Sequence, residues 1–451
     1  MDKMAKSVLT MVLIILALSG INVRAQEYSQ KYSLQQCIDF AVNNSYAAHR
    51  ANLDIREAEH QMQEARAGVL PQINASGSYD NNIVLPTMMM PGEIIGEPGT
   101  QIPVQIGTKN TLDLSVAAEQ IIFAPSLFTG IKIAKNNGEL QRLRAKMTQE
   151  EIIFDVSYVF YDILNSMQEL DNINYMITKQ DSLSLLMKRR VEENITREVD
   201  LNRVTVNLTN LRARGENIKN TISQQKRYMQ ILIGMPVGDI LELDDSLASE
   251  VGGPGGDDGL NKPFYRTEID ILNKQKDIIE LDIRLSKMGY LPTLSATASA
   301  GYQFQADNMN LSKEPWFSTV IVGVRLSVPI FDGFSKRSRV KQKQVQFKRL
   351  EWEITETEQH IFASYRDAKD RLQVIYHLIQ AQSENLQLAE KVYTQTMALY
   401  SEGLANITDL LETETSLREA KIAYTTELIR FKKTEIDLSK ANGTLLERVK
   451  N

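Results

Sequence analysis

The alternation of apolar and polar residues divides the first third of the chain into helical and extended segments. Apolar residues recur at helical spacing over 33–68, and Leu70-Pro71 ends this pattern because the residue before a proline avoids the helical region. Apolar and polar residues alternate over 72–80 and again over 111–123, which predicts two β-strands. The polar, proline-rich segment between them, 81–109, is interpreted as a long loop.

The same order of elements recurs in the second half of the chain. Residues 267–289 have a helical pattern that stops before Leu291-Pro292. Alternating runs near 293–304 and 319–331 then predict two further strands, separated by a shorter loop. Because helix, strand, loop and strand occur twice in the same order, the chain contains an internal repeat.

Long helical stretches follow each pair of strands. All twelve prolines lie outside 126–235 and 330–451, and proline-free runs of this length predict very long helices. Apolar residues step by seven along both stretches, and corresponding positions are 209 residues apart, as Leu201 and Leu410 are. A seven-residue period sustained over this length is typical of a coiled coil.

Each long helical stretch contains one short break, and the two breaks lie at the same position of the repeat. Asn194-Ile195-Thr196 interrupts the first stretch, and Gly403-Leu404-Ala405 interrupts the second 209 residues later. We therefore expect two antiparallel helical hairpins, 126–233 and 334–442, whose tips are these two triplets.

The repeat predicts the domain organisation of the mature chain. The first structural repeat covers 26–235, a linker covers 236–263, and the second structural repeat covers 264–451. The linker contains Gly252-Gly253-Pro254-Gly255-Gly256, which resembles a phosphate-binding loop. However, no predicted strand leads into this run and no helix start with a lysine follows it, which argues against nucleotide binding.

The chain begins with a pattern typical of exported proteins. Residues 1–25 combine two lysines with an apolar run over 8–18 and small residues at the end, as a secretory signal peptide does. This apolar run is too short to span a bilayer, and the alternative interpretation is a buried first helix.

Charge and cysteine content narrow the class of protein further. The formal net charge of −6 argues against nucleic acid as a partner, because nucleic acid requires clustered basic residues. The single cysteine, Cys37, excludes a disulfide framework. Its position well inside the mature chain also argues against an N-terminal lipid anchor.

The four predicted strands bear most directly on function. Open sheet edges cannot face lipid, so the strands of one exported chain either form a small soluble sheet on the helices or join those of other copies. Eight strands from two copies would be filled by side chains, whereas twelve strands from three copies leave a lumen. Small polar residues within the strands suit a wet lumen: Ser76, Ser78, Ser295, Thr297 and Ser299.

In this combination of features the chain resembles the TolC-like outer membrane efflux factors over essentially its whole mature length. The residues that carry the resemblance are Ser33-Leu34-Gln35-Gln36-Cys37-Ile38 with Asn43-Asn44, Ala65-Arg66-Ala67-Gly68-Val69-Leu70-Pro71, Leu326-Ser327-Val328-Pro329-Ile330-Phe331-Asp332-Gly333 and Asp409-Leu410-Leu411. The resemblance implies an α+β membrane protein that forms a homotrimer. Twelve shared strands would form a β-barrel in the outer membrane, and the coiled-coil hairpins would form an α-barrel that extends into the periplasm.

The resemblance further implies a channel that passively exports small molecules or proteins across the periplasm and the outer membrane. The expected partners are two further copies of the chain, a periplasmic adaptor, an inner-membrane transporter and outer membrane lipid, with no nucleic acid. We expect no cofactor, no metal and no enzyme activity, because the four histidines are scattered and none forms a metal motif. The alternative is an exported coiled-coil structural or adaptor protein without a pore.

The resemblance also implies a pore constriction just after the second hairpin tip. Asp409 and Glu412 match positions at which the family forms rings of acidic residues, and their spacing places both on one helix face. In a trimer they would form two stacked rings that attract cations. The alternative role of these carboxylates is to complement the helix dipole, with Asn406 or Thr408 as the capping residue, and both roles are compatible.

The hairpin tips are the expected contacts with the adaptor. Asp200 occupies the place of Asp409 in the first hairpin, and Arg203 occupies the place of Glu412. The family has a basic residue four positions before the first carboxylate of the second tip, where this chain has Ala405. The residues assigned to the tips and the adaptor contact are Asn194, Ile195, Thr196, Asp200, Gly403, Leu404 and Ala405.

Overall fold

The computed structural model of the chain describes residues 31–91, 96, 99–244, 266–311 and 315–448. The predicted signal peptide at 1–25 lies outside the described residues, as does most of the predicted linker at 236–263. Within the described part, long helices and antiparallel strands occupy separate stretches, which confirms the predicted α+β class. None of the helices in this part is both long enough and apolar enough to cross a membrane.

The described residues form two compact units, and each unit draws on both halves of the sequence. The first unit contains Met1–Ser45, Asp155–Gly253 and Ile375–Lys433. The second unit contains Tyr46–Phe154, Pro254–Val374 and Thr434–Asn451. Each compact unit therefore combines residues of both predicted repeats.

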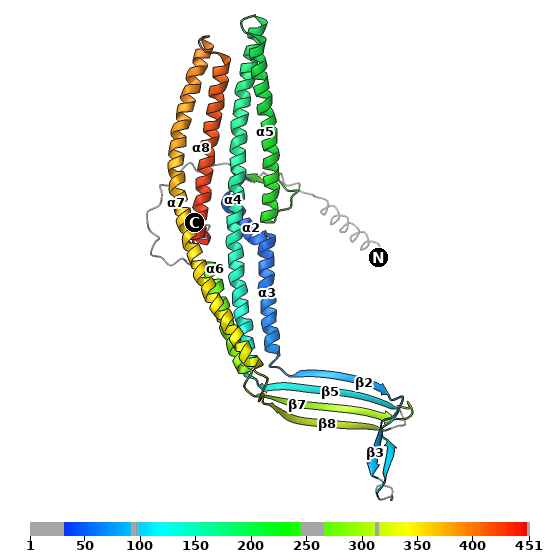
Figure 1. Cartoon of the computed structure of the whole chain (residues 1–451). Helices are drawn as coiled ribbons and strands as arrows, with labels where there is room; N and C mark the ends of the chain where they lie inside the picture. Colours follow the sequence, from blue (N-terminus) through cyan, green and yellow to red (C-terminus); the bar gives the residue numbers. More distant parts are fainter. Residues whose placement is uncertain (1–30, 92–95, 97–98, 245–265, 312–314, 449–451) are drawn as a thin grey trace, which may run out of the picture. The chain divides into compact units, whose positions relative to one another are not determined.

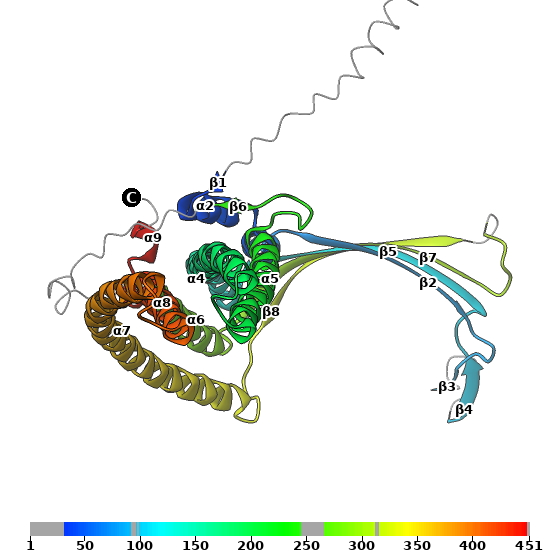
Figure 2. The same ribbon diagram turned by 90° about the horizontal axis from the view of Figure 1, so that it is seen from above.

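Four strands of the second unit form one antiparallel sheet in the order β2-β5-β7-β8 (Figures 1 and 2). Their bounds are β2 (Gln72–Asn81), β5 (Asn110–Phe123), β7 (Thr293–Ala306) and β8 (Trp316–Ser327). β5 and β7 pair at the centre, with Leu114 opposite Tyr302, so the sheet joins the two halves of the sequence. β2 and β8 are left as the edge strands.

The segment at 81–109 is not the structureless loop that the sequence predicts. β3 (Thr87–Pro91) pairs in antiparallel register with β4 (Gln101–Gln105), so that interpretation is wrong over these residues. Met88 lies opposite Val104 and Met89 lies opposite Pro103. Three consecutive methionines hide the alternation that would predict a strand. Proline normally argues against a strand except at the edge of a sheet, and both strands of this two-stranded sheet are edge strands.

Four long helices form the hairpins: α4 (Pro125–Glu192), α5 (Glu198–Ile233), α7 (Ser335–Ser401) and α8 (Ile407–Ala441). α4 has 68 residues, and at 1.5 Å per residue it is about 100 Å long. The chain reverses direction between α4 and α5 and again between α7 and α8 (Figure 1). These reversals coincide with the two breaks in the sequence pattern.

The remaining helices are α2 (Leu34–Asn44), α3 (Tyr46–Ala67), α6 (Thr267–Met288) and α9 (Leu445–Arg448). The continuous helix expected over 33–68 is therefore wrong, because Ser45 interrupts it in an extended conformation (φ −64°, ψ 147°). Ser33 starts α2 with a capping box, in which its Oγ accepts a hydrogen bond from the Gln36 backbone at 3.3 Å.

In the first unit, the end of α5 packs closely on α2. Gly234 ends α5 with φ 81°, and a Cβ added there would lie 2.1 Å from the carbonyl oxygen of Asn44, so only glycine fits. Nearby, the short strands β1 (Lys31–Tyr32) and β6 (Glu242–Leu243) pair in parallel. Cys37 of α2 is fully buried, and burial raises the pKa of its thiol to about 12, so the thiol stays protonated.

Candidate functional site at the hairpin tips

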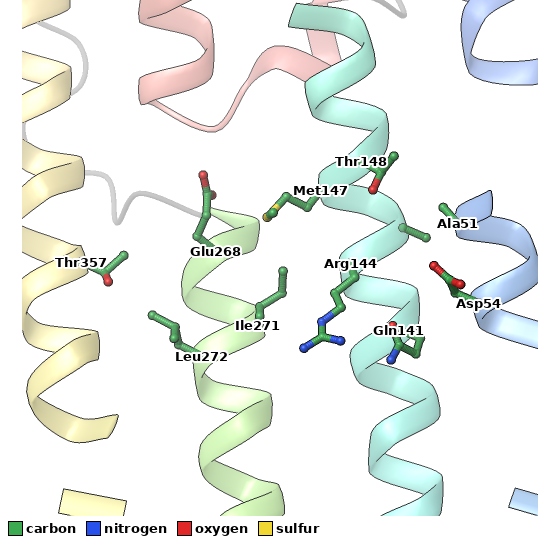
Figure 3. Close-up of a pocket in the computed structure, with 11 residues that line it drawn as sticks. Ala51, Asp54, Gln141, Arg144, Met147, Thr148, Glu268, Ile271, Leu272 and Thr357 are labelled. Carbon is green, nitrogen blue, oxygen red and sulfur yellow. The ribbon is translucent and has the colours of Figure 1, made fainter. Parts of the chain in front are cut away.

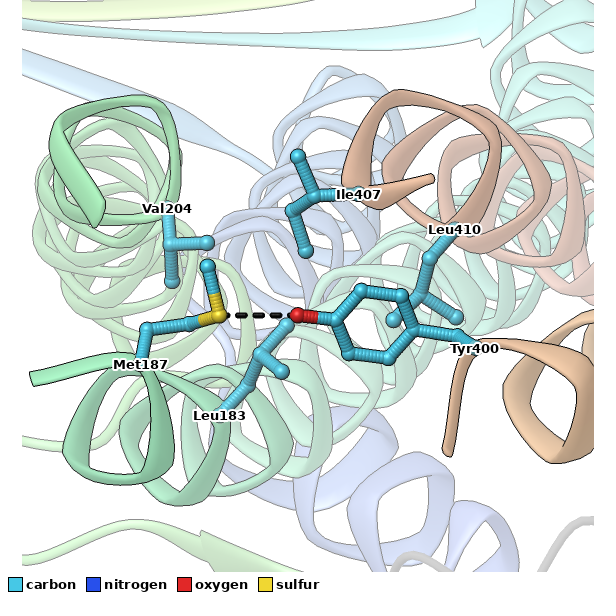
Figure 4. Close-up of a cluster of buried hydrophobic side chains, with 6 residues drawn as sticks. All are labelled: Leu183, Met187, Val204, Tyr400, Ile407 and Leu410. Carbon is cyan, nitrogen blue, oxygen red and sulfur yellow. Dashed lines mark hydrogen bonds between the residues drawn. The ribbon is translucent and has the colours of Figure 1, made fainter. Parts of the chain in front are cut away.

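An apolar cluster joins the two hairpins close to their tips (Figure 4). α4 and α5 of the first hairpin meet α7 and α8 of the second, through Leu183, Met187, Val204, Tyr400, Ile407 and Leu410. Within the cluster, the Tyr400 hydroxyl donates a hydrogen bond to the Met187 sulfur at 2.8 Å. These contacts hold the tips of the two hairpins side by side.

The two tips have the same backbone turn. Asn194 (φ 57°) and Gly403 (φ 78°) both take the left-handed conformation, and each is the second residue after a long helix. The next residue then returns a hydrogen bond to the helix: the backbone nitrogen of Ile195 donates to the Arg190 carbonyl, and that of Leu404 donates to the Leu399 carbonyl, each at 2.8 Å. The donors, like the acceptors, are 209 residues apart.

The tip residues differ in exposure. Ile195 and Leu404 are 66% and 71% exposed, although both are large and apolar. Thr196 is half-buried, and so is Ala405, which packs against the apolar cluster. The apex of each hairpin therefore presents one aliphatic side chain to its surroundings.

The second tip begins its return helix with a reciprocal cap. Asn406 Oδ1 accepts a hydrogen bond from the Asp409 backbone at 2.9 Å, and Asp409 Oδ2 accepts one from the Asn406 backbone at 3.4 Å. This is the geometry of a capping box, and it stabilises the start of α8. Asp409 and Glu412 are both exposed, so the capping role leaves the two carboxylates accessible.

At the first tip, the corresponding carboxylate of Asp200 is in a different environment. Asp200 is only 7% exposed, and Arg197 Nε lies 3.4 Å from its Oδ2. Arg203 Nη1 lies 4.0 Å from the other carboxylate oxygen. Arg197 precedes α5 and makes no side-chain cap, so the start of α5 lacks the hydrogen bonds that Asn406 supplies to α8. Asp200 is thus ion-paired with arginines of its own hairpin, although its buried Oδ1 makes no hydrogen bond among the described residues.

Arg203 also reaches across to the second hairpin. Its Nη1 donates a hydrogen bond to Thr408 Oγ1 at 2.8 Å. The sequence places Arg203 where the second repeat has Glu412, but it does not predict the contact between Arg203 and Thr408. Ala405 stands where the family has a basic residue, and this difference was the available sign that another basic residue contacts the second tip. That residue is Arg203, on the first hairpin.

The second unit contains a pocket of about 510 Å³ between α3, α4, α6 and α7 (Figure 3). Its lining combines apolar side chains such as Met147 and Ile271 with the charged groups of Asp54, Arg144 and Glu268. It contains no histidine or cysteine, and no group of three potential metal ligands occurs among the described residues.

Comparison with known proteins relates the whole chain to one group of channels. The family model described as "Outer membrane efflux protein" matches residues 277–444. The outer membrane protein TolC of Escherichia coli is 22% identical over 464 aligned residues, which cover 97% of this chain and 86% of that protein. The toluene efflux pump outer membrane protein TtgC of Pseudomonas putida is 21% identical, with 91% of this chain and 83% of that protein covered.

Solved structures share the fold. The outer membrane protein VceC of Vibrio cholerae superposes with a TM-score of 0.70 at 15% identity, covering 91% of this chain and 96% of VceC. The Campylobacter jejuni CmeC outer membrane channel gives a TM-score of 0.69 at 15% identity, with 92% and 88% covered. At 15% identity this likeness shows a shared fold.

Proposed function

Because this chain is a TolC-like outer membrane efflux factor, we propose that three copies of it form one channel-tunnel that passively exports small molecules or proteins. The protein belongs to the outer membrane and extends into the periplasm, and members of its family are channels without enzyme activity. In each copy, the repeats at 26–235 and 264–451 would supply one hairpin and two strands apiece.

The main support for this proposal is the four-stranded sheet, whose two edge strands have no neighbour on their outer side among the described residues. β2 and β8 are edge strands, and all ten residues of β2 are exposed. On β8, Val320, Val322 and Val324 are 75%, 80% and 69% exposed, which is far more apolar surface than a strand in water normally presents. Pairing the edge strands of three copies would satisfy their hydrogen bonds, place these valines against lipid and leave a lumen.

The hairpin tips are the proposed docking surface for a periplasmic adaptor, which would link the channel to an inner-membrane transporter that supplies energy. Exposed Ile195 and Leu404 support this role, because they give each apex an apolar contact. The left-handed backbones of Asn194 and Gly403 form the turns that present them, and Thr196 and Ala405 are the half-buried residues that follow. Buried Asp200 would act indirectly, by fixing Arg197 and Arg203 at the first tip.

Asp409 and Glu412 are the proposed pore constriction. Both carboxylates are exposed and lie on one face of α8, next to the apolar cluster that holds the hairpins together. In a trimer they would form two rings of three negative charges, which attract cations and repel anions. The capping bonds of Asp409 would also fix the position of its ring.

Planar-bilayer recording tests the proposed constriction. We expect the double variant Asp409→Asn/Glu412→Gln to conduct with reduced cation selectivity, seen as a reversal potential closer to zero under a salt gradient. Glu216→Gln/Glu419→Gln changes the net charge equally at exposed positions elsewhere and is expected to keep the wild-type reversal potential. An unchanged reversal potential in the Asp409 and Glu412 variant would contradict the assignment.

Assembly is tested separately. The full chain, purified from outer membranes, is expected to migrate as a trimer on a gel and as a monomer after heating. Migration as a monomer without heating, or fractionation with soluble periplasmic proteins, would instead support the exported coiled-coil protein without a pore.

A further inference from the structure

A buried polar pair connects the two hairpins a few residues beyond the proposed constriction. Glu414 of α8 is 6% exposed and Gln180 of α4 is 1% exposed. The side-chain nitrogen of Gln180 donates a hydrogen bond to Glu414 Oε2. The pair therefore links α4 of the first hairpin to α8 of the second inside the first unit, where the two tips also lie.

The amide oxygen of this pair has no partner. Within the described part of the chain, Gln180 Oε1 is buried and makes no hydrogen bond. An unpaired buried acceptor is costly, and an ionised carboxylate cannot relieve it because it has no proton to donate. A protonated carboxyl group can donate to the amide oxygen while it accepts from the amide nitrogen. The missing bond is thus the one that the acid form of Glu414 would make.

The surroundings of Glu414 favour the acid form. Met176 of α4, Leu211 of α5 and Leu417 of α8 form an apolar cluster nearby, against which Tyr393 of α7 packs. Burial is the largest effect and raises the pKa of Glu414 to about 7, whereas the Gln180 hydrogen bond and the positive charge of Arg418 act to lower it.

The charge of Arg418 offsets the burial of Glu414 only in part, because burial has the larger effect on its pKa. Arg418 lies on the same helix, but its Nε is buried without a hydrogen-bond partner among the described residues. On α7, burial and then the nearby Glu414 charge raise the pKa of Tyr393, so this phenol stays neutral. On α5, Arg212 is engaged by Asp181 of α4 at 2.7 Å.

We propose that Glu414 and Gln180 form a proton-dependent clasp, which holds the two hairpins together when the carboxyl group is protonated and loosens when it is ionised. In the protonated state the two side chains share two hydrogen bonds. Loss of the proton removes one bond and leaves a negative charge in an apolar region. The clasp occurs once per chain, because the corresponding residue of the first hairpin, Thr205, is exposed.

The direction of the pH dependence follows from the raised pKa. The packed hairpins bind this proton more tightly than an exposed glutamate does, so the clasp is nearly complete at about pH 6, is half lost at about pH 7 and is almost absent at about pH 8. A role of the clasp in opening the channel rests on the proposed function. The contact between the two hairpins does not depend on that function.

Distance measurement by electron paramagnetic resonance tests the clasp in the purified full chain. Spin labels on Ser182→Cys and Ser416→Cys report the separation of α4 and α8, and both positions are exposed. Buried Cys37 is not expected to react. Between pH 6 and pH 8 we expect the population with long or broad distances to rise about tenfold, as the ionised fraction of a group with this pKa does.

Two variants give the matched comparison. Glu414→Gln can form both amide hydrogen bonds without a proton, so its distances are expected to stay short at every pH. Glu419→Gln removes an exposed carboxylate from the same helix and should leave the pH transition unchanged. A transition that persists in Glu414→Gln, or that is absent from the wild-type labelled chain, would overturn the clasp.

Infrared spectroscopy of the unlabelled chain covers the case in which Glu414→Gln does not fold. A protonated carboxyl band that persists above pH 6 and disappears by pH 8 is expected, and its absence would overturn the proposal. Neither measurement requires conductance. A chain that does not conduct but shows the distance change and the carboxyl band would contradict the channel function and support the clasp. A chain that conducts but shows neither signal would support the channel function and contradict the clasp.

Discussion

At the first hairpin tip the carboxylate of Asp200 is buried beside two arginines, whereas its counterpart at the second tip, Asp409, is exposed and caps its own helix. The backbone turns that lead to these residues are the same. A duplicated hairpin has thus kept its turn while its charged groups have taken on different roles.

This difference has a physical basis. Asp200 is buried beside Arg197 and Arg203, so its charge is shielded from ions in solution more than the charge of an exposed carboxylate is. An exposed carboxylate that bonds only to backbone nitrogen keeps its charge available to ions outside the protein. The second tip is therefore the better candidate for controlling what passes, and the first tip, whose Arg203 bonds to Thr408, is the better candidate for holding the two hairpins together.

Leu201 and Leu410 occupy the same position in the two hairpins. Their substitution is expected to give the largest difference in stability between the two tips. Leu410 is 1% exposed in the centre of the apolar cluster, whereas Leu201 packs only at its margin. Leu410→Ala is expected to cost about 2–5 kcal/mol in free energy of unfolding because it leaves a cavity, and Leu201→Ala is expected to cost clearly less. Thermal unfolding of the full chain in detergent, followed by circular dichroism, measures both. Equal losses would show that the tips are packed alike.

The helix starts provide a smaller test. Asn406→Ala removes the cap of α8 and is expected to destabilise the second hairpin by about 1 kcal/mol. Arg197→Ala is the matched change at the first tip, where the side chain is 82% exposed and caps nothing. Its cost is expected to stay below about 1 kcal/mol, because the arginine of this ion pair is exposed and Arg203 still lies beside Asp200 in the variant. Hydrogen exchange of the first turns of α5 and α8 resolves the two effects, and faster exchange in both would contradict the assigned difference.

The turn residues give the smallest expected effect. Asn194 and Gly403 have the same left-handed backbone, and a Cβ at Gly403 would meet no atom within 4 Å. Asn194→Gly should therefore stabilise the first hairpin by a few tenths of a kcal/mol, and Gly403→Asn should destabilise the second by a similar amount, up to about 1 kcal/mol. The melting temperatures of the single variants and of the exchanged pair measure this. A large loss in either variant would mean that the two turns are not equivalent.

The sequence is informative wherever structure depends on local periodicity. The four alternating runs correspond to β2, β5, β7 and β8, and the breaks at Asn194 and Gly403 coincide with the hairpin tips. The interruption at Ser45 was missed because serine is acceptable within a helix and no proline or glycine marks the break. The β3–β4 hairpin was missed because its methionines and prolines do not alternate.

The polar contacts of the site depend on which helix faces meet, and periodicity does not define this. Arg203 and Thr408 are 205 residues apart in sequence, and Gln180 and Glu414 are 234 apart. Each of these residues is unremarkable among the many polar positions of a long helix. Asp409 shows the intermediate case, because its capping role was one of two roles predicted from its position in the first helical turn, and the hydrogen bonds of Asn406 confirm that geometry.

The parallel pairing of β1 with β6 has a consequence for the order of folding. Lys31 lies beside Glu242, so these two short strands close a loop that contains nearly the whole first repeat. The entropy lost on closing a loop increases with the length of the loop. A contact between such distant residues therefore stabilises the chain only after the intervening elements have formed. We therefore expect the β1–β6 pair to form after the first hairpin during folding and to separate before it during unfolding.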